Sequence, residues 1–285
     1  MKSSLVKKLV KPVSGWFRNR ARPANQNGCK MNRIVRLRAG IDAAAMRGLE
    51  VGALDKPIVR KDEGFILYVD YLDTEGLKRR YTQDPVPDCS VDDIVSVDAV
   101  WGNNTIDQAV GWRGPLDYVI ASHVGEHVPD FLSWLQELSS VLRPGGFINL
   151  ALPDKRYCFD HLRRETSITD LLTAYFLKAR RPQPQQIIDF CSHFHPISPA
   201  EGWNGTAAKP LLAELGQLEH AFAMAQDSLN GNYQDVHCWA FTSSGFKALI
   251  EQAEALGIVD LVCDDVVETE VNELEFFVTL RKKAA

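Results

Sequence analysis

The chain has 285 residues, of which 45% are hydrophobic and 24% charged, a composition typical of a soluble globular protein with one or two domains. Its six cysteines lie far apart and form no CxxC pair, which argues against a zinc ribbon and against a disulfide framework. No apolar run reaches ~18 residues and the N-terminus lacks a long apolar segment, so we expect neither a transmembrane helix nor a cleaved signal peptide.

Residues 1–40 differ from the rest of the chain in charge. They hold five lysines, six arginines and no acid, a charge of +11, whereas the other 245 residues carry −16, since the whole chain carries −5. The acidic body argues against binding to nucleic acid. In the basic arm, Trp16 and Phe17 stand among lysines and arginines, a pattern typical of segments that lie on anionic membranes. We expect a cytoplasmic protein whose arm contacts the inner face of a membrane; a disordered basic tail is the alternative.

Residues 41–285 alternate between strand and helix patterns. Five short apolar runs predict strands: 48–52, 65–70, 94–98, 117–122 and 147–152. Helices are expected at 74–80, 131–142 and 243–256, and two further strands at 258–271 and 274–281. This order predicts an α/β fold with a doubly wound, mostly parallel, seven-stranded sheet, to which the terminal hairpin adds an antiparallel strand.

A long segment separates the fifth strand from the late helix. It spans about 154–241 and carries helical patterns near 168–181, 185–195 and 210–229. A loop of this length is uncommon in a compact domain. We therefore expect a helical cap, inserted into the domain and lying over the strand ends.

Polar side chains follow the first two predicted strands. Glu50, Gly52 and Ala53 close the first strand, and Asp70 closes the second. In open α/β sheets ligands bind beyond the carboxyl ends of the strands, and an acid about 20 residues past the first turn holds ribose hydroxyls. The spacing of Glu50 and Asp70 fits this rule, although Gly52 is the one glycine present of the three in a dinucleotide fingerprint.

Several short pieces occur in an order known from one large family. They are Leu-Glu-Val-Gly at 49–52, Tyr-Val-Asp at 68–70, Asp-Tyr-Val-Ile-Ala-Ser-His at 117–123, Glu-His-Val at 126–128 and Leu-Arg-Pro-Gly-Gly at 142–146. Over residues 46–153 and 240–281 the chain resembles class I S-adenosylmethionine-dependent methyltransferases, most closely the branch encoded beside enzymes that build bacterial surface glycans. The resemblance implies a Rossmann-like fold, S-adenosylmethionine as cofactor, and methyl transfer to an oxygen or nitrogen of a small-molecule or glycan-type acceptor.

The resemblance also implies roles for single residues. Those around the cofactor are Glu50, Gly52 and the adjoining Ala53 at the methionine part, Asp70 at the ribose, Asp98 or its neighbours at the adenine, and Ser122 with His123 on the sulfonium side. Where the family has a glycine-rich loop, this chain has Ala53-Leu54-Asp55. That departure favours a second interpretation, a non-catalytic binding module with the same fold.

Acceptor-binding and catalytic candidates follow the fifth strand and close the cap. Asp154, Lys155 and Arg156 lie at a ligand-facing edge and suit an anionic acceptor, with a solvated loop as the alternative. His237 is our first candidate for the base that takes the acceptor's proton, and His127 is the second. The alternative for His237 is a packed or hydrogen-bonded histidine beside aromatic residues, and for His127 a histidine that packs at the start of the next helix.

His123-Val-Gly-Glu-His127 matches the HxxEH pattern of inverted zincins, which supports a third interpretation, a metal-dependent hydrolase. That chemistry needs both histidines on one helical face. Here the motif crosses an expected hinge from strand to helix, with Gly125 inside it and Pro129 after it. We therefore expect no metal ligands.

Overall fold

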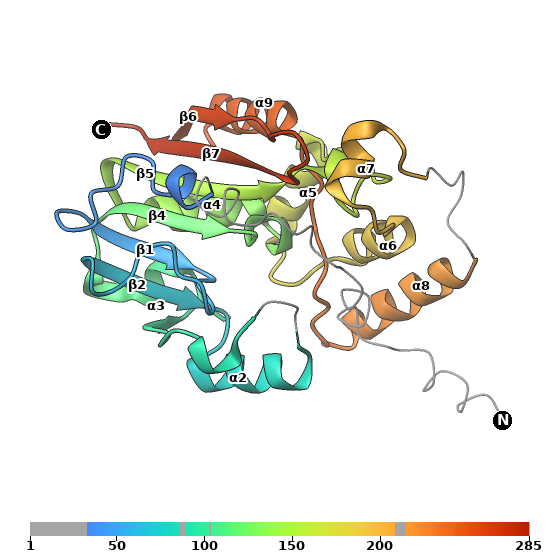
Figure 1. The fold of residues 1–285 in the computed structure, drawn as a ribbon, viewed down its shortest axis with the longest axis horizontal. Coiled ribbons are helices and arrows are strands. Elements are labelled where there is room, and N and C mark those ends of the chain that lie inside the picture. The colour runs from blue at the N-terminus through green and yellow to red at the C-terminus, as the bar shows by residue number, and fades with distance from the viewer. Residues whose placement is uncertain (1–32, 86–88, 103, 209–214, 285) are drawn as a thin grey trace.

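The computed structural model describes residues 33–85, 89–102, 104–208 and 215–284. They form one seven-stranded sheet of order β3-β2-β1-β4-β5-β7-β6. The strands are β1 Arg47–Val51, β2 Phe65–Asp70, β3 Ala99–Val100, β4 Leu116–Ser122, β5 Leu142–Pro153, β6 Leu261–Val267 and β7 Glu275–Lys282. Strands β1 to β5 run parallel, and β7 runs antiparallel to β5 and β6 (Figure 1). The predicted doubly wound, mostly parallel sheet is confirmed.

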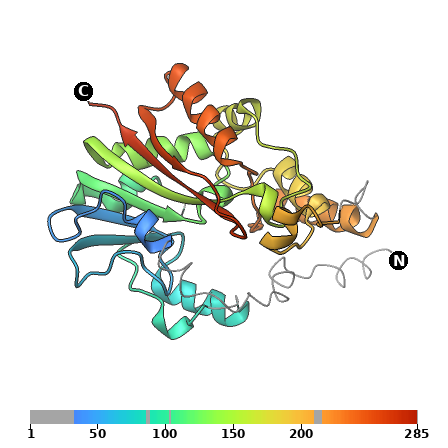
Figure 2. The same cartoon turned by 45° about the horizontal axis from the view of Figure 1, so that its top comes forward.

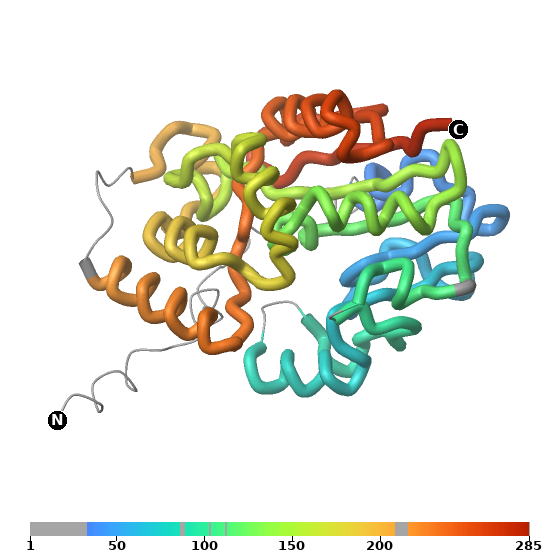
Figure 3. The backbone as a smooth tube through the Cα atoms, turned by 180° about the vertical axis from the view of Figure 1, so that it is seen from behind, coloured from blue at the N-terminus to red at the C-terminus, as the bar shows by residue number. Residues whose placement is uncertain are grey.

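Helices cover one face of this sheet closely. The helices of the described chain are α2 Thr74–Gln83, α3 Ile106–Val110, α4 Phe131–Ser140, α5 Ile168–Leu177, α6 Pro184–His193, α7 Pro199–Asn204, α8 Leu215–Leu229 and α9 Ser243–Ala255, besides a short helix at 33–37. Figure 3, from behind, shows α4 in front of the strands. Asp130 caps α4 by accepting a hydrogen bond from Ser133 N at 3.0 Å. Leu132, Leu135 and Leu138 of this helix are fully buried. Each such side chain contributes about 1.5–3 kcal/mol.

The first described residues pack on the opposite face. Leu37 is fully buried, and Asn149 Nδ2 donates to the carbonyls of Leu37 and Ala39 at 3.0 and 2.9 Å. Arg38 forms an ion pair with Glu63 at 2.7 Å. Residues 33–40 were placed in the basic arm because of their positive charge, but these contacts show that they pack on the body. The rest of the predicted arm lies outside the described residues.

The third strand differs from its prediction. It covers Ala99–Val100, not 94–98. Two amides before it bind elsewhere: Val95 N donates to Leu54 O at 2.8 Å and Val97 N to Thr74 Oγ1 at 2.9 Å. Contact with β2 starts at Asp98, whose N donates to Tyr68 O at 2.8 Å, so the residues before Asp98 form an irregular segment.

The cap lies beyond the carboxyl ends of the parallel strands. Helices α6, α7 and α8 gather there, to the right in Figures 1 and 2. Cys191 Sγ of α6 lies 3.5 Å from Met224 Sδ of α8, so these two helices pack together. Helix α5 ends before its predicted limit because Lys178 takes a left-handed conformation, φ 50°. No helix in the described ranges is long and apolar enough to cross a membrane.

Candidate functional site

The turn after β1 depends on a glycine. Gly52 has φ +72°, and a Cβ there would lie 2.8 Å from Val124 Cγ2. Glu50, just before it, is buried and accepts from Ile58 N at 2.9 and 3.0 Å and from Val59 N at 3.3 Å. Burial raises the pKa of Glu50 to about 7, although these amides act in the opposite direction. The Glu50 carboxylate therefore faces the chain's own loop, and Ala53 is buried beside it.

Asp70 keeps part of its hydrogen-bonding capacity. It ends β2, is 6% exposed, and accepts from Tyr71 N at 2.7 Å. No second hydrogen-bond partner for this carboxylate exists among the described residues. Burial raises the pKa of Asp70 to about 6. A buried carboxylate with a spare oxygen suits a ligand that brings hydroxyl donors.

Asp98 is not brought to this edge. It precedes β3, and its two oxygens bind Lys61 Nζ at 2.6 Å and Tyr68 N at 2.9 Å. The residue that follows β3 is Trp101, whose backbone N donates to Asp70 O at 2.7 Å. Its indole nitrogen is buried without a hydrogen-bond partner. Trp101 was not a predicted site residue, because the third strand was expected at 94–98 and in fact ends at Val100.

Ser122 and His123 end β4 inside a charged cluster. The Arg33 guanidinium donates to Ser122 Oγ and pairs with Glu275 at 3.0 Å. His123 Nε2 lies 2.7 Å from the same Glu275 carboxylate, and His123 Nδ1 lies 3.2 Å from Glu126. Burial lowers the pKa of His123, but the two carboxylates outweigh it and raise the pKa to about 9. Arg33 and Glu275 carried no local sequence signal, since only the fold brings them to β4.

Glu126, His127 and His237 form a second cluster under the cap. One possible ligand atom from each lies within 4.8 Å of the others, and the two imidazole rings meet edge to face at 4.7 Å. Glu126 is fully buried, and His123 Nδ1, at 3.2 Å, is the one side-chain partner of its carboxylate among the described residues. Cys238 N donates to Glu126 O at 2.7 Å, which joins the cap's last segment to the turn after β4. Both predicted catalytic histidines are therefore neighbours.

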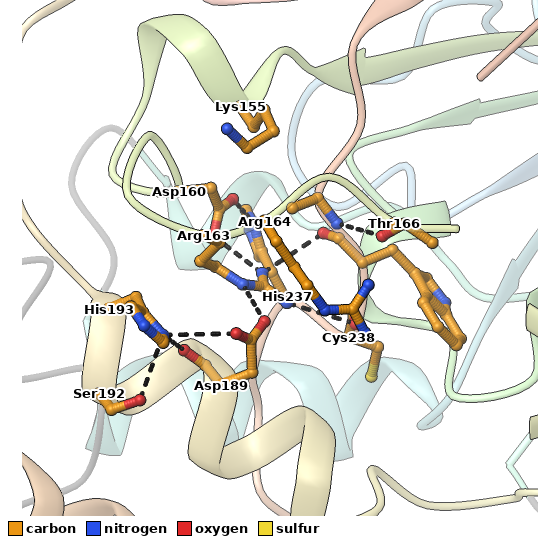
Figure 4. A network of polar contacts seen from close by, with 12 residues as sticks. Lys155, Asp160, Arg163, Arg164, Thr166, Asp189, Ser192, His193, His237 and Cys238 are labelled. Atoms are coloured by element: carbon orange, nitrogen blue, oxygen red, sulfur yellow. Dashed lines mark hydrogen bonds and ion pairs between the residues drawn. The ribbon is translucent and has the colours of Figure 1, made fainter. Parts of the chain in front are cut away.

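Carboxylates support each histidine of this cluster. His237 Nδ1 lies 2.6 Å from Asp160 Oδ2, and Asp160 Oδ1 accepts from Arg163 at 2.9 Å (Figure 4). His127 Nδ1 lies 3.0 Å from Asp235 Oδ1. Burial would raise the pKa of Asp160, but His237 and Arg163 hold it well below its usual range. Asp160 and Arg163 were missed because they lie more than 70 residues before His237 in the sequence. Asp235, two residues before His237, was noted in the sequence, but its contact with the distant His127 was not predicted.

In the predicted acceptor-binding triplet, Asp154 and Arg156 bind each other. Asp154 is fully buried and binds Arg156 Nε at 2.9 Å and Nη2 at 2.6 Å, besides Thr269 Oγ1 at 2.9 Å. Lys155 Nζ donates to His161 O at 3.4 Å. The charge of Arg156 is thus matched inside the protein, and Asp154 anchors a turn.

Asp70 and the histidine cluster lie at the same end of the sheet. Strands β2 and β4 both run parallel to β1, so Asp70 at the end of β2 and the turn that follows β4, which carries Glu126 and His127, lie at the carboxyl ends of parallel strands. Two surface hollows, one around Gly40 and Phe147 and one around Leu150 and Phe277, contain none of the candidate residues. The chemistry-bearing side chains gather at the strand ends, away from both hollows.

Comparisons with family models and with curated proteins gave no match. Several similar solved structures are methyltransferases. The CcbJ methyltransferase from Streptomyces caelestis has 10% identity and a TM-score of 0.46, with 93% of this chain and 100% of that chain covered. The N-methyltransferase NodS from Bradyrhizobium japonicum WM9 has 10% identity and a TM-score of 0.42, with 92% and 98% covered. A protein provisionally described as a Zn-dependent alcohol dehydrogenase from Rhodobacter sphaeroides has 11% identity and a TM-score of 0.48, with 98% of this chain and 97% of that chain covered. Likenesses this weak carry no argument about activity.

Proposed function

We propose that this protein transfers the methyl group of S-adenosylmethionine to an oxygen or nitrogen of a small-molecule or glycan-type acceptor. The observation that carries the proposal is the buried, half-satisfied carboxylate of Asp70 at the carboxyl end of β2. It stands in a sheet of order β3-β2-β1-β4-β5-β7-β6 with an antiparallel β7. In such sheets the ligand lies beyond the carboxyl ends of the strands.

The residues present fit this cofactor at its ribose end. Asp70 would accept from the ribose hydroxyls, and the turn at Gly52 would let the backbone approach closely. When bound, the cofactor supplies a methyl group on a positively charged sulfur. Glu50 would act indirectly, because its hydrogen bonds with Ile58 and Val59 hold the loop beside that turn.

The cap and the turn after β4 together supply the acceptor side of the proposed site. His127 and His237 would contact the acceptor, and Asp160 would fix the ring orientation of His237 through the 2.6 Å contact. Holding donor and acceptor in line contributes most of the rate in such transfers. Among the predicted triplet, Lys155 is the side chain we retain for an anionic or glycan acceptor, since Arg156 is already paired with Asp154.

A non-catalytic binding module is the second candidate, and one observation favours it. The Arg33 guanidinium binds Ser122 and Glu275 at the end of β4, where the resemblance assigns the sulfonium side. A cation held there would oppose a positively charged sulfonium and favour the neutral thioether of S-adenosylhomocysteine. Such a module would bind the product form and transfer nothing.

Calorimetry with both cofactor forms and a methyl-transfer screen test these proposals together. We expect full-length protein to bind S-adenosylmethionine and to label sugar or lipid-linked acceptors from a radioactive methyl donor. Asp70→Asn should lose cofactor affinity, whereas the matched Asp98→Asn should keep it, because Asp98 is held by Lys61 and Tyr68. Binding of S-adenosylhomocysteine alone, with no labelled product, would support the binding module. Absence of binding to either form would refute both proposals.

A further inference from the structure

We propose that Glu126, His127 and His237 bind a divalent transition-metal ion such as Zn²⁺ or Mn²⁺. Their ligand atoms lie within 4.8 Å of one another, a spacing that one ion can bridge. The three residues come from the turn after β4 and from the end of the cap. Two imidazoles and one carboxylate are a common protein ligand set for these ions.

The state of Glu126 points to a ligand. Its side chain is fully buried, and among the described residues its carboxylate oxygens meet one side-chain partner, His123 Nδ1 at 3.2 Å. The other ring nitrogen of His123 binds Glu275 at 2.7 Å, so this histidine is shared between two carboxylates. Burying a carboxylate with so few polar partners is costly. A metal ion would satisfy this carboxylate directly.

The carboxylates behind the histidines fit the same role. Asp160 lies 2.6 Å from His237 Nδ1, and Asp235 lies 3.0 Å from His127 Nδ1. Because these contacts engage Nδ1, the ion would bind the Nε2 atom of each histidine. Metal-binding histidines usually present their second nitrogen to a carboxylate or carbonyl, which fixes the ring and raises its basicity. Figure 4 shows Asp160 held in turn by Arg163.

The local charge balance also favours a cation. The cluster contains the carboxylates of Glu126, Asp160 and Asp235. Arg163 is the fixed cation against Asp160, and it is shared with Asp189 at 2.8 Å. Metal binding requires neutral imidazoles, so His127 and His237 would then offset none of this negative charge, and the other cationic partner in contact is His123, 3.2 Å from Glu126. A divalent ion would add two positive charges to a site that holds three carboxylates.

This ligand set differs from the one suggested by the HxxEH motif. His123 faces Glu275 at 2.7 Å through Nε2 and Glu126 at 3.2 Å through Nδ1, so both of its ring nitrogens are engaged. His237, 110 residues beyond His127 in the sequence, takes the place that His123 would have had. The proposal thus replaces our expectation that the protein has no metal ligands.

The ion would narrow the class of acceptor, an extension that rests on the proposed function. Three protein ligands leave open coordination positions, as catalytic sites do. A hydroxyl oxygen that binds there has its pKa lowered, whereas an alkylammonium group is repelled. The acceptor would accordingly be a hydroxyl compound, such as a sugar or phenol, and not an amine.

The test is metal binding by the full-length chain. Protein is stripped with a chelator, dialysed, and titrated calorimetrically with ZnCl₂ and with MnCl₂, while elemental analysis gives the stoichiometry. We expect one ion per chain for wild type. Glu126→Gln and His237→Gln should weaken the affinity at least ~100-fold, and Asp160→Asn about 10- to 100-fold. His193→Gln is the matched control, a cap histidine paired with Asp189 at 3.3 Å outside the cluster, and should bind like wild type.

Folding is checked separately by circular dichroism, because Glu126 is wholly buried. Asp235→Asn provides a milder variant, since the Asp235 side chain is 48% exposed, and it should also weaken binding. Visible absorption of added Co²⁺ should report nitrogen ligands in wild type and change in His237→Gln. Wild type without a stoichiometric ion, or folded Glu126→Gln with unchanged affinity, would overturn the proposal. Calorimetry with S-adenosylhomocysteine tests the methyltransferase proposal separately: an ion without cofactor binding upholds the metal site alone, and cofactor binding without an ion upholds methyl transfer alone.

Discussion

Replacing Asp70 with asparagine should weaken cofactor binding and stabilise the free protein. The carboxylate is 6% exposed and binds one amide, so burial raises its pKa from 3.8 to about 6. Because the folded state binds this proton more tightly than the unfolded state, the stability of wild type falls as the pH rises from 3.8 to about 6 and is level above that. This rise in the pKa of Asp70 corresponds to about 3 kcal/mol of folding stability that wild type loses at neutral pH.

The neutral asparagine side chain would remove that penalty while keeping an oxygen that accepts from Tyr71 N. At pH 7 and without cofactor, Asp70→Asn should therefore be more stable than wild type by up to about 3 kcal/mol in urea titrations. The difference should vanish near pH 3.8, where wild type is protonated in the folded state and loses the penalty. A destabilised variant at pH 7 would refute the argument, since it would mean that the carboxylate has a partner that stabilises its charge.

Cofactor affinity should move in the opposite direction. Hydrogen bonds to a charged acceptor contribute about 1.5–3 kcal/mol, so loss of the charge should weaken S-adenosylhomocysteine binding roughly 10- to 150-fold. Wild-type affinity should itself fall below pH 6, by about tenfold at pH 5, because protonated Asp70 no longer accepts from both ribose hydroxyls. Asp70→Asn should show no such pH dependence, and Asp98→Asn should match wild type throughout. Identical pH profiles for wild type and Asp70→Asn would exclude Asp70 as the ribose acceptor.

Three further perturbations test other parts of the molecule. His237→Gln should abolish labelled methyl transfer but leave S-adenosylhomocysteine affinity unchanged; a loss of cofactor affinity in calorimetry would show that His237 does not act on the acceptor side. Leu37→Ala should cost about 2–5 kcal/mol in urea titrations, because the side chain is fully buried; a cost near zero would return residues 33–40 to the arm. Deletion of residues 1–32 should abolish binding to anionic liposomes at low salt, where each engaged Lys or Arg contributes about 1 kcal/mol, without changing stability; full-length protein that ignores such liposomes contradicts the membrane role.

The fold was predictable because its strands carry their own signals. Buried parallel strands read as apolar runs whatever surrounds them, and β2 was found with the bounds that the structure shows. The third strand was predicted too early because residues 94–98 have a similar apolar pattern, but the amides of Val95 and Val97 bind Leu54 and Thr74 instead of β2. Residues 33–40 were assigned to the arm because of their positive charge. A single buried leucine, Leu37, gives no detectable core signal among so many basic residues.

The site was predictable only on the side built by strand ends. Parallel topology brings the ends of β1, β2 and β4 to one edge, so Asp70, Ser122 and His123 could be named without coordinates. Their partners come from remote segments, Glu275 from β7 and Arg33 from the segment before the sheet. No local pattern encodes such pairings, since each requires the whole sheet to be assembled.

The HxxEH segment illustrates why a motif needs its backbone. His123 has a left-handed φ of 54°, and only Gly125–His127 form a short 3₁₀ turn, so the motif does cross a hinge and its two histidines do not share a helical face. His123 turns toward Glu275, while Glu126 and His127 turn toward the cap and meet His237. The cap therefore does more than cover the strand ends, because it supplies the third side chain of the cluster. The cofactor half of the proposed site is made by strand ends, whereas the cap contributes His237 to the other half. Changes in the cap should therefore alter which acceptor is bound and leave cofactor binding unchanged.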